Sequence, residues 1–129
     1  MTAREAVKTI KDGTTLAIIA MTQVSASTSI LKEIERSFLE EGHPRDLTYV
    51  HTCGQASAGK PGGMQYIAYE GLLKRVIGGH WGQSAKMMDL ITENRIEAFN
   101  LPQGQMANMF HSMALREPGK LSKVGLGTY

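Results

Sequence analysis

The chain has 129 residues, of which 42% are hydrophobic and 20% charged, so the composition excludes a disordered protein and predicts one folded domain. Its formal net charge is +2, with 14 basic residues scattered among 12 acidic ones, and a nucleic-acid partner is therefore not expected. The longest apolar run, residues 16–21, is far shorter than the ~20 residues of a membrane-spanning helix, and no signal peptide or membrane partner is predicted.

The predicted elements alternate between helix and strand from the start of the chain. The segment from Thr2 to Glu5 is typical of a capping box, and a short helix to about Ile10 is expected after it. Residues 15–20 form a continuous apolar run of strand length, which indicates a strand buried on both faces of a parallel sheet. Apolar residues then recur at helical spacing over 30–39, and Gly42 ends that helix.

The same alternation continues through the second half of the chain. The pattern predicts strands at 47–51, 76–77 and 96–99, a Gly-rich loop at 54–63, and helices at about 65–74, 84–94 and 104–115. Because the connections are too long for hairpins, the expected fold class is α/β, an open and mostly parallel sheet of right-handed βαβ units with helices on both faces. From Arg116 onward glycine and proline prevent an assignment, and we expect the chain to end within a loop, before its active site is complete.

Two short motifs suggest chemistry that the surrounding residues argue against. Gly54-Gln-Ala-Ser-Ala-Gly-Lys-Pro61 nearly matches the phosphate-binding pattern G-x-x-x-x-G-K-[ST], but Pro61 replaces the hydroxyl residue and removes an amide donor. A loop on the active-site side is therefore the better interpretation. Cys53 and His51 are two residues apart, but such close neighbours rarely have the geometry of a nucleophile and its base, so a buried thiol is expected.

The cysteines and histidines of the sequence indicate the cellular compartment and whether a metal site is expected. A single cysteine excludes an internal disulfide and, with the absence of a signal-like start, predicts a cytoplasmic protein. The four histidines show no ligand spacing such as H-x-x-x-H, so no metal site is predicted.

A stripe of methionines on the last predicted helix leaves two interpretations open. Met106, Met109 and Met113 recur beside Phe110 at helical spacing. Thioether side chains adapt to varied apolar ligands, so the stripe is a candidate wall of an acyl pocket. Plain core or a subunit interface accounts for the same spacing.

Two further segments follow proposed strands and therefore lie at the ligand-binding edge of a parallel sheet. They are residues 75–82 and 100–104. Gly78 and Gly79 allow close approach of the backbone, and Gln103 at a helix start offers a side-chain amide and free backbone donors to a developing oxyanion. A sharp strand-to-helix turn is the alternative explanation of the same glycines and of Pro102.

The chain resembles the amino-terminal part of the family I coenzyme A transferases of the single-chain acetate or propionate type. The matching segments are Thr2-Ala-Arg-Glu-Ala-Val-Lys8, Gly42-His-Pro-Arg-Asp-Leu-Thr48, Glu70-Gly-Leu-Leu-Lys-Arg-Val-Ile-Gly-Gly-His-Trp-Gly82, Asn100-Leu-Pro-Gln-Gly104 and Lys123-Val-Gly-Leu-Gly-Thr128. The resemblance implies open α/β domains in tandem, of which residues 1–129 supply the amino-terminal part of one. It also implies a ping-pong transfer of coenzyme A from an acyl thioester to a short-chain carboxylic acid, through a glutamyl-coenzyme A thioester.

The resemblance also implies roles for particular residues and partners. The family's nucleophilic glutamate lies in the carboxyl-terminal part, beyond Tyr129, and none of the nine glutamates of this chain is in a matching motif. Gln103 is expected to act as an oxyanion or substrate-positioning donor. Substrate-binding roles are expected for Gly54, Gln55, Gly78, Gly79, His80, Gly104 and Met21. Coenzyme A is expected as a substrate rather than as a permanently bound cofactor, and the partners are the carboxyl-terminal part of the enzyme and further copies in a homo-oligomer.

One loop departs from the family pattern. Where the family has a Gly-Gly-Phe-x-Gly loop after its first strand, this chain has Ile19-Ala-Met-Thr-Gln-Val-Ser25, so side chains occupy positions where bare backbone would approach the acyl or pantetheine portion. This departure motivates an alternative hypothesis, a non-catalytic acyl-CoA-binding or assembly module on the same scaffold. A sugar-phosphate isomerase or hydrolase that shares the fold is a third.

Overall fold

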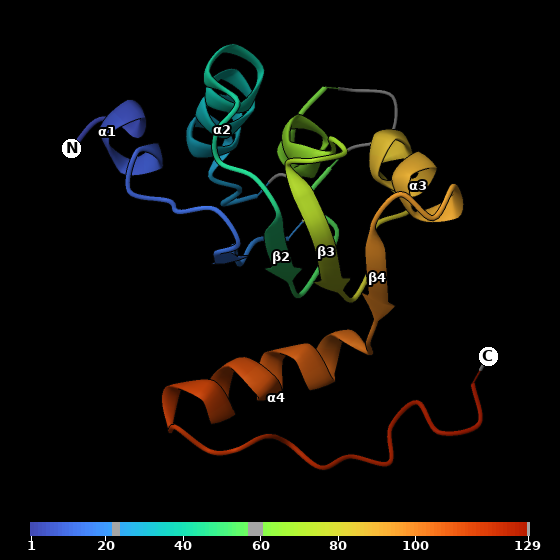
Figure 1. Cartoon of the computed structure of the whole chain (residues 1–129). Helices are drawn as coiled ribbons and strands as arrows, with labels where there is room; N and C mark the ends of the chain where they lie inside the picture. The colour runs from blue at the N-terminus through green and yellow to red at the C-terminus, as the bar shows by residue number, and fades with distance from the viewer. Residues whose placement is uncertain (22–23, 57–60, 129) are drawn as a thin grey trace.

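Four parallel strands form one sheet in the order β1-β2-β3-β4 in the computed structural model, which describes residues 1–21, 24–56 and 61–128 (Figure 1). The strands are β1 (Thr15–Ala17), β2 (Leu47–His51), β3 (Leu73–Gly78) and β4 (Glu97–Asn100). The helices are α1 (Ala3–Val7), α2 (Thr28–Glu41), the 3-10 helix η1 (Gly63–Ile67), α3 (Ala85–Thr92) and α4 (Gln103–Ala114). The prediction of an α/β fold with an open parallel sheet is confirmed.

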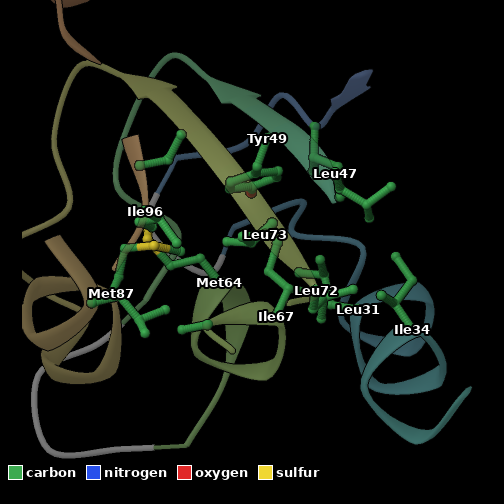
Figure 2. Packing of buried hydrophobic residues seen from close by; sticks show 14 of the residues in the cluster. Leu31, Ile34, Leu47, Tyr49, Met64, Ile67, Leu72, Leu73, Met87 and Ile96 are labelled. Atoms are coloured by element: carbon green, nitrogen blue, oxygen red, sulfur yellow. The ribbon is translucent and has the colours of Figure 1, made fainter. Parts of the chain in front are cut away.

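The helices that connect the strands lie on one face of this sheet. Because each strand is added beside the one before it, right-handed crossovers place every connection on the same side. Figure 2 shows the resulting core between the strands and α2, η1 and α3. Its labelled side chains are Leu31, Ile34, Leu47, Tyr49, Met64, Ile67, Leu72, Leu73, Met87 and Ile96. These connecting helices form one layer, and α4 lies outside it (Figure 1).

Local signals account for several element boundaries. The Thr2 hydroxyl accepts a hydrogen bond from the Glu5 amide while the Glu5 carboxylate accepts one from the Thr2 amide, so the predicted capping box is confirmed. Helix α2 ends at Gly42, which has a φ of 70°. This left-handed conformation is unfavourable for residues that carry a side chain. The helix expected over 65–74 is wrong: η1 ends at Ile67, and Gly71, with φ of 84°, turns the chain into β3.

Helix α4 leaves the layer of connecting helices and lies across the carboxyl ends of the strands, where the arrows of β2, β3 and β4 point in Figure 1. Residues 115–128 that follow contain no helix or strand. In the described part of the chain, no helix combines the length and the apolar character needed to cross a membrane.

Candidate functional site

The carboxyl ends of all four strands lie at one end of the sheet, where α4 crosses them (Figure 1). Neighbouring strands end in register, His51 opposite Gly78 and Gly78 opposite Asn100. The Leu101 amide donates to the Gly78 carbonyl oxygen over 3.0 Å, so the chain enters α4 directly beside the end of β3. The segments after the strands therefore form the edge at which parallel α/β sheets bind ligands.

Glycines let these segments touch through their backbones. A Cβ atom on Gly79 would lie 2.3 Å from the Thr52 carbonyl oxygen and 3.1 Å from the Cα of Gln103. One on Gly78 would lie 2.3 Å from Nε2 of His51, and one on Gly54 would lie 2.9 Å from the His80 ring. The predicted close approach of the backbone is present, and in this chain it joins segments of the protein to each other.

Gln55 is a buried structural residue. Its side-chain nitrogen donates to the Ile18 carbonyl oxygen over 2.6 Å, and its side-chain oxygen accepts a hydrogen bond from the Tyr49 hydroxyl. The side chain is fully buried, so the amide ties the end of β1 to β2 and leaves no face for a substrate. Gln55 has a supporting role in this structure, and the expected substrate contact stays a prediction.

His51 and Cys53 do not form a nucleophile and base. Nδ1 of His51 lies 2.9 Å from the Cys53 carbonyl oxygen, which can only accept, so this nitrogen carries the proton. The ring is buried, stacks on Tyr49 with 5.1 Å between centroids, and makes an edge contact with Trp81. Burial holds the pKa of His51 below its usual value. Cys53 is only half-buried, which corrects the expectation of a buried thiol.

Two adjoining open cavities lie between α4 and the strand ends. The first, which we name the helix hollow, has a volume of about 430 Å³ and is lined by Ile19, Thr52, Gln103, Gly104, Ala107 and Phe110. The second, the loop hollow, has a volume of about 370 Å³ and is lined by Ile19, Ala20, Met21, Val24, Ser25, Thr52, Cys53 and Gln103. Ile19, Thr52 and Gln103 belong to both and separate them. No lining residue of either hollow, among those described, carries a charged side chain.

The amino end of α4 contributes donors to this region. Its N-cap is Pro102, which makes no side-chain capping bond, while the amides of Gln105 and Met106 both donate to the Pro102 carbonyl oxygen. The amides of Gln103 and Gly104 have no carbonyl before them in the helix to bond, as in the first turn of any helix. The end of the helix also carries a partial positive charge. It thus suits a carboxylate or an oxyanion.

The predicted site residues separate into two groups. Gln103, Gly104 and Met21 line the hollows, whereas Gly54, Gln55, Gly78, Gly79 and His80 lie among the supporting turns. Sequence reasoning missed Thr52 and Ala107 as lining residues. The position of Thr52 directly after a strand was the available signal. Of the methionine stripe, Met106 is buried and Met113 is 56% exposed, while the neighbouring Phe110 lines the helix hollow.

Other candidate binding sites on the chain are less suited to bind a ligand. An open depression of about 530 Å³ includes Lys74 and Arg95 but lies at the amino ends of β3 and β4, the opposite edge from the usual ligand site, and Arg95 is paired with Glu93 over 2.8 Å. The Gly59-Lys60 part of the phosphate-loop-like motif lies outside the described residues. Among residues 1–21, 24–56 and 61–128, no three His, Cys, Asp or Glu side chains gather to hold a metal ion.

Comparison with known proteins identifies the family to which this arrangement belongs. The family model described as "Coenzyme A transferase" matches residues 1–129. This chain belongs to the coenzyme A transferase family. It is 32% identical over 130 residues to the acetate CoA-transferase YdiF of Escherichia coli O157:H7 and 33% identical over 129 residues to the caffeate CoA-transferase of Acetobacterium woodii. It spans about a quarter of both relatives, 24% of their length.

The family membership extends to the three-dimensional structure. The crystal structure of the Escherichia coli O157:H7 acyl-CoA transferase in a thioester complex with CoA matches with a TM-score of 0.92 and 32% identity. The match covers 98% of this chain and 26% of that one. The α/β scaffold of this chain and its arrangement are thus those of part of a CoA-transferase.

Proposed function

We propose that this chain is the amino-terminal part of an acyl-CoA:carboxylate CoA-transferase, and that it works with a carboxyl-terminal part that supplies the nucleophilic glutamate. The observation that carries the proposal is the pair of uncharged hollows that meet at Gln103 beside the amino end of α4. They offer neutral donors and apolar walls but no acidic side chain among the described lining residues. Such a site orients a thioester and relies on another segment for the attacking carboxylate.

The proposed reaction conserves every group. The glutamate carboxylate attacks the acyl-CoA carbonyl carbon, the carbon–sulfur bond breaks, and coenzyme A leaves as the thiolate from an acyl-glutamyl anhydride. The thiolate then attacks the glutamyl carbonyl carbon, which releases the first carboxylate and leaves a glutamyl-coenzyme A thioester. A second, short-chain carboxylate repeats these steps in reverse and departs as the new acyl-CoA, which regenerates the glutamate.

Gln103 has the proposed role of stabilising the oxyanion that forms at each attack. Its side chain is exposed at the boundary between the hollows, and the first-turn amides of α4 lie at the same end. Donors fixed on a helix need no reorganisation when negative charge develops on the carbonyl oxygen.

The sheet face opposite the connecting helices is closed at Val50, which is 4% exposed, and open at β4, which supports a partner segment there. Ala17, Val50, Ile77 and Phe99 pair in register across the four strands and, by alternation with the core residues Tyr49 and Val76, point away from the connecting helices. Phe99 is 51% exposed. We propose that the carboxyl-terminal part covers the open end of this row at Phe99. A homo-oligomer and a cytoplasmic location remain predictions.

The alternative, a non-catalytic acyl-CoA-binding or assembly module, rests on the loop after β1. Three of its described members, Ile19, Met21 and Val24, are 62–64% exposed where the family pattern has a Gly-rich loop. Acyl transfer from acyl-CoA to acetate, measured on the chain with and without the carboxyl-terminal part, separates the two functions. Transfer only with that part supports the transferase, substantial transfer by the 129 residues alone contradicts the division of labour, and binding of acyl-CoA without transfer in either case favours the module.

The role of Gln103 has its own test in the complete enzyme. Gln103→Ala should lower kcat by about 10²-fold or more, the usual effect of losing an oxyanion donor. Gln105→Ala is the matched control, because Gln105 lies on the same helix but faces the chain after α4 rather than the hollows. Equal kcat values for the two variants would remove the oxyanion role.

A further inference from the structure

The boundary between the two hollows has the form that a thioester carbonyl requires. A thioester carbon carries two substituents, the acyl chain and the sulfur-linked arm of coenzyme A. Ile19, Thr52 and Gln103 line both cavities, of which one is otherwise lined by α4 and the other by the segments after β1 and β2. A carbonyl held at Gln103 therefore has one cavity available for each substituent.

The helix hollow has the chemistry of an acyl-chain site. Gln103, Ala107 and Phe110 follow one another at helical spacing and present one face of α4, opposite Ile19. Beyond Thr52 and Gln103, the lining side chains are apolar. The loop hollow instead adds Ser25 and Cys53, whose hydroxyl and thiol offer polar partners to an amide-bearing arm.

We propose that the helix hollow binds the acyl chain, and that it selects uncharged chains larger than acetyl, such as butanoyl, over acetyl and over chains that end in a second carboxylate. This inference rests on the proposed function and names its substrate class. The loop hollow then receives the sulfur-linked arm.

Size and charge both lead to this selection. A water molecule takes about 30 Å³ in the liquid, so an acetyl methyl would fill a small part of a cavity of about 430 Å³. Each added methylene in an apolar pocket changes kcat/KM by roughly 10–200-fold. A chain that ends in a carboxylate would lose its water without gaining a cation, since no described residue that lines the hollow is basic.

The test compares acetyl-, butanoyl- and succinyl-CoA as donors to one common acceptor in the complete protein. Butanoyl and succinyl chains have the same number of carbon atoms, and succinyl carries a carboxylate in place of the terminal methyl. Ala107→Phe fills the hollow from an exposed helix position, and Asn108→Phe adds the same bulk at an exposed neighbour that lines neither hollow. Phe110→Ala enlarges the hollow and gives a second variant. Circular dichroism verifies that each variant is folded.

The expected result is a kcat/KM for butanoyl-CoA at least about tenfold above those for acetyl- and succinyl-CoA. Ala107→Phe should lower the butanoyl-to-acetyl ratio by about tenfold, Asn108→Phe should leave it unchanged, and Phe110→Ala should shift the preference toward hexanoyl-CoA. Similar values for all three donors, or an equal fall of the ratio in Ala107→Phe and Asn108→Phe, would overturn the inference while the transferase function stands.

Calorimetry with free butanoate, acetate and succinate separates failure of the pocket from failure of the proposed function. If no donor supports transfer but butanoate binds selectively and Ala107→Phe abolishes that binding, the acyl site is upheld and the transferase function is wrong. If neither transfer nor selective binding occurs, both are wrong.

Discussion

At the scale of single residues, the glycines at the strand ends act through the space that they leave. Sequence reasoning assigned Gly78 and Gly79 to the ligand edge, and the structure puts them there, but their missing side chains make room for His51 and for the Thr52 backbone. A motif in sequence indicates that a close approach exists. It does not reveal which partner approaches, because that partner comes from another strand.

Gly79→Ala should destabilise the fold and displace the start of α4. Its Cβ would lie 2.3 Å from the Thr52 carbonyl oxygen, a backbone atom that cannot move away cheaply. Overpacking of this kind costs about 1–3 kcal/mol of unfolding free energy, measurable by urea denaturation.

Gly104→Ala is the control for that substitution. No atom lies within 4 Å of the Cβ it would add, and the residue is in the first turn of α4, so alanine should be neutral or stabilise by up to about 1 kcal/mol. Equal losses in both variants would show that the crowding at Gly79 is not the cause.

At the scale of elements, local signals predicted most helices and failed where the chain turns. The capping box at Thr2 and the stop at Gly42 depend on neighbours in sequence, and both are confirmed. The prediction of a helix over 65–74 did not take account of the turn at Gly71, after which β3 begins at Leu73. Short strands inside a mixed apolar stretch depend on pairing with distant strands, which periodicity alone does not reveal.

Helix α3 depends on its cap more than α2 does. The buried Ser84 hydroxyl accepts a hydrogen bond from the Met87 amide over 3.3 Å, whereas Ser27 at the start of α2 makes no side-chain capping bond. Ser84→Ala should therefore lower the unfolding free energy by about 1 kcal/mol. Ser27→Ala should change it by less than about 0.5 kcal/mol. Thermal unfolding of the two variants provides the comparison, and a larger loss for Ser27→Ala would contradict this account.

At the scale of the whole molecule, the parallel α/β class followed from the alternation of strands and helices, but the order of the strands in the sheet did not. Strand order decides which face each crossover covers, and the sequence pattern carries no direct record of that order. The two hollows could not be predicted from the sequence either. Thr52 and Ala107 are far apart in sequence and line one cavity only because α4 crosses the strand ends.

The stability of the whole fold should fall as the pH decreases below about 7, through His51. Desolvation lowers the pKa of His51 in the folded state, its hydrogen bond to the Cys53 carbonyl opposes this shift, and His80 adds to the lowering. The unfolded state, with a histidine pKa of about 6.5, then binds the proton more strongly than the folded state. Unfolding free energy should decrease by at most about 1.4 kcal/mol per pH unit below that value until the folded pKa is reached.

His51→Phe tests this dependence, because phenylalanine retains a ring for stacking on Tyr49 but does not titrate. The variant also loses the bond to Cys53, which changes its stability at every pH, so only the slopes are comparable. Urea denaturation between pH 5 and pH 8 should give a shallower decline for the variant than for the wild type. Parallel curves would mean that the buried imidazole does not couple protonation to folding. The pH dependence would then belong to other groups.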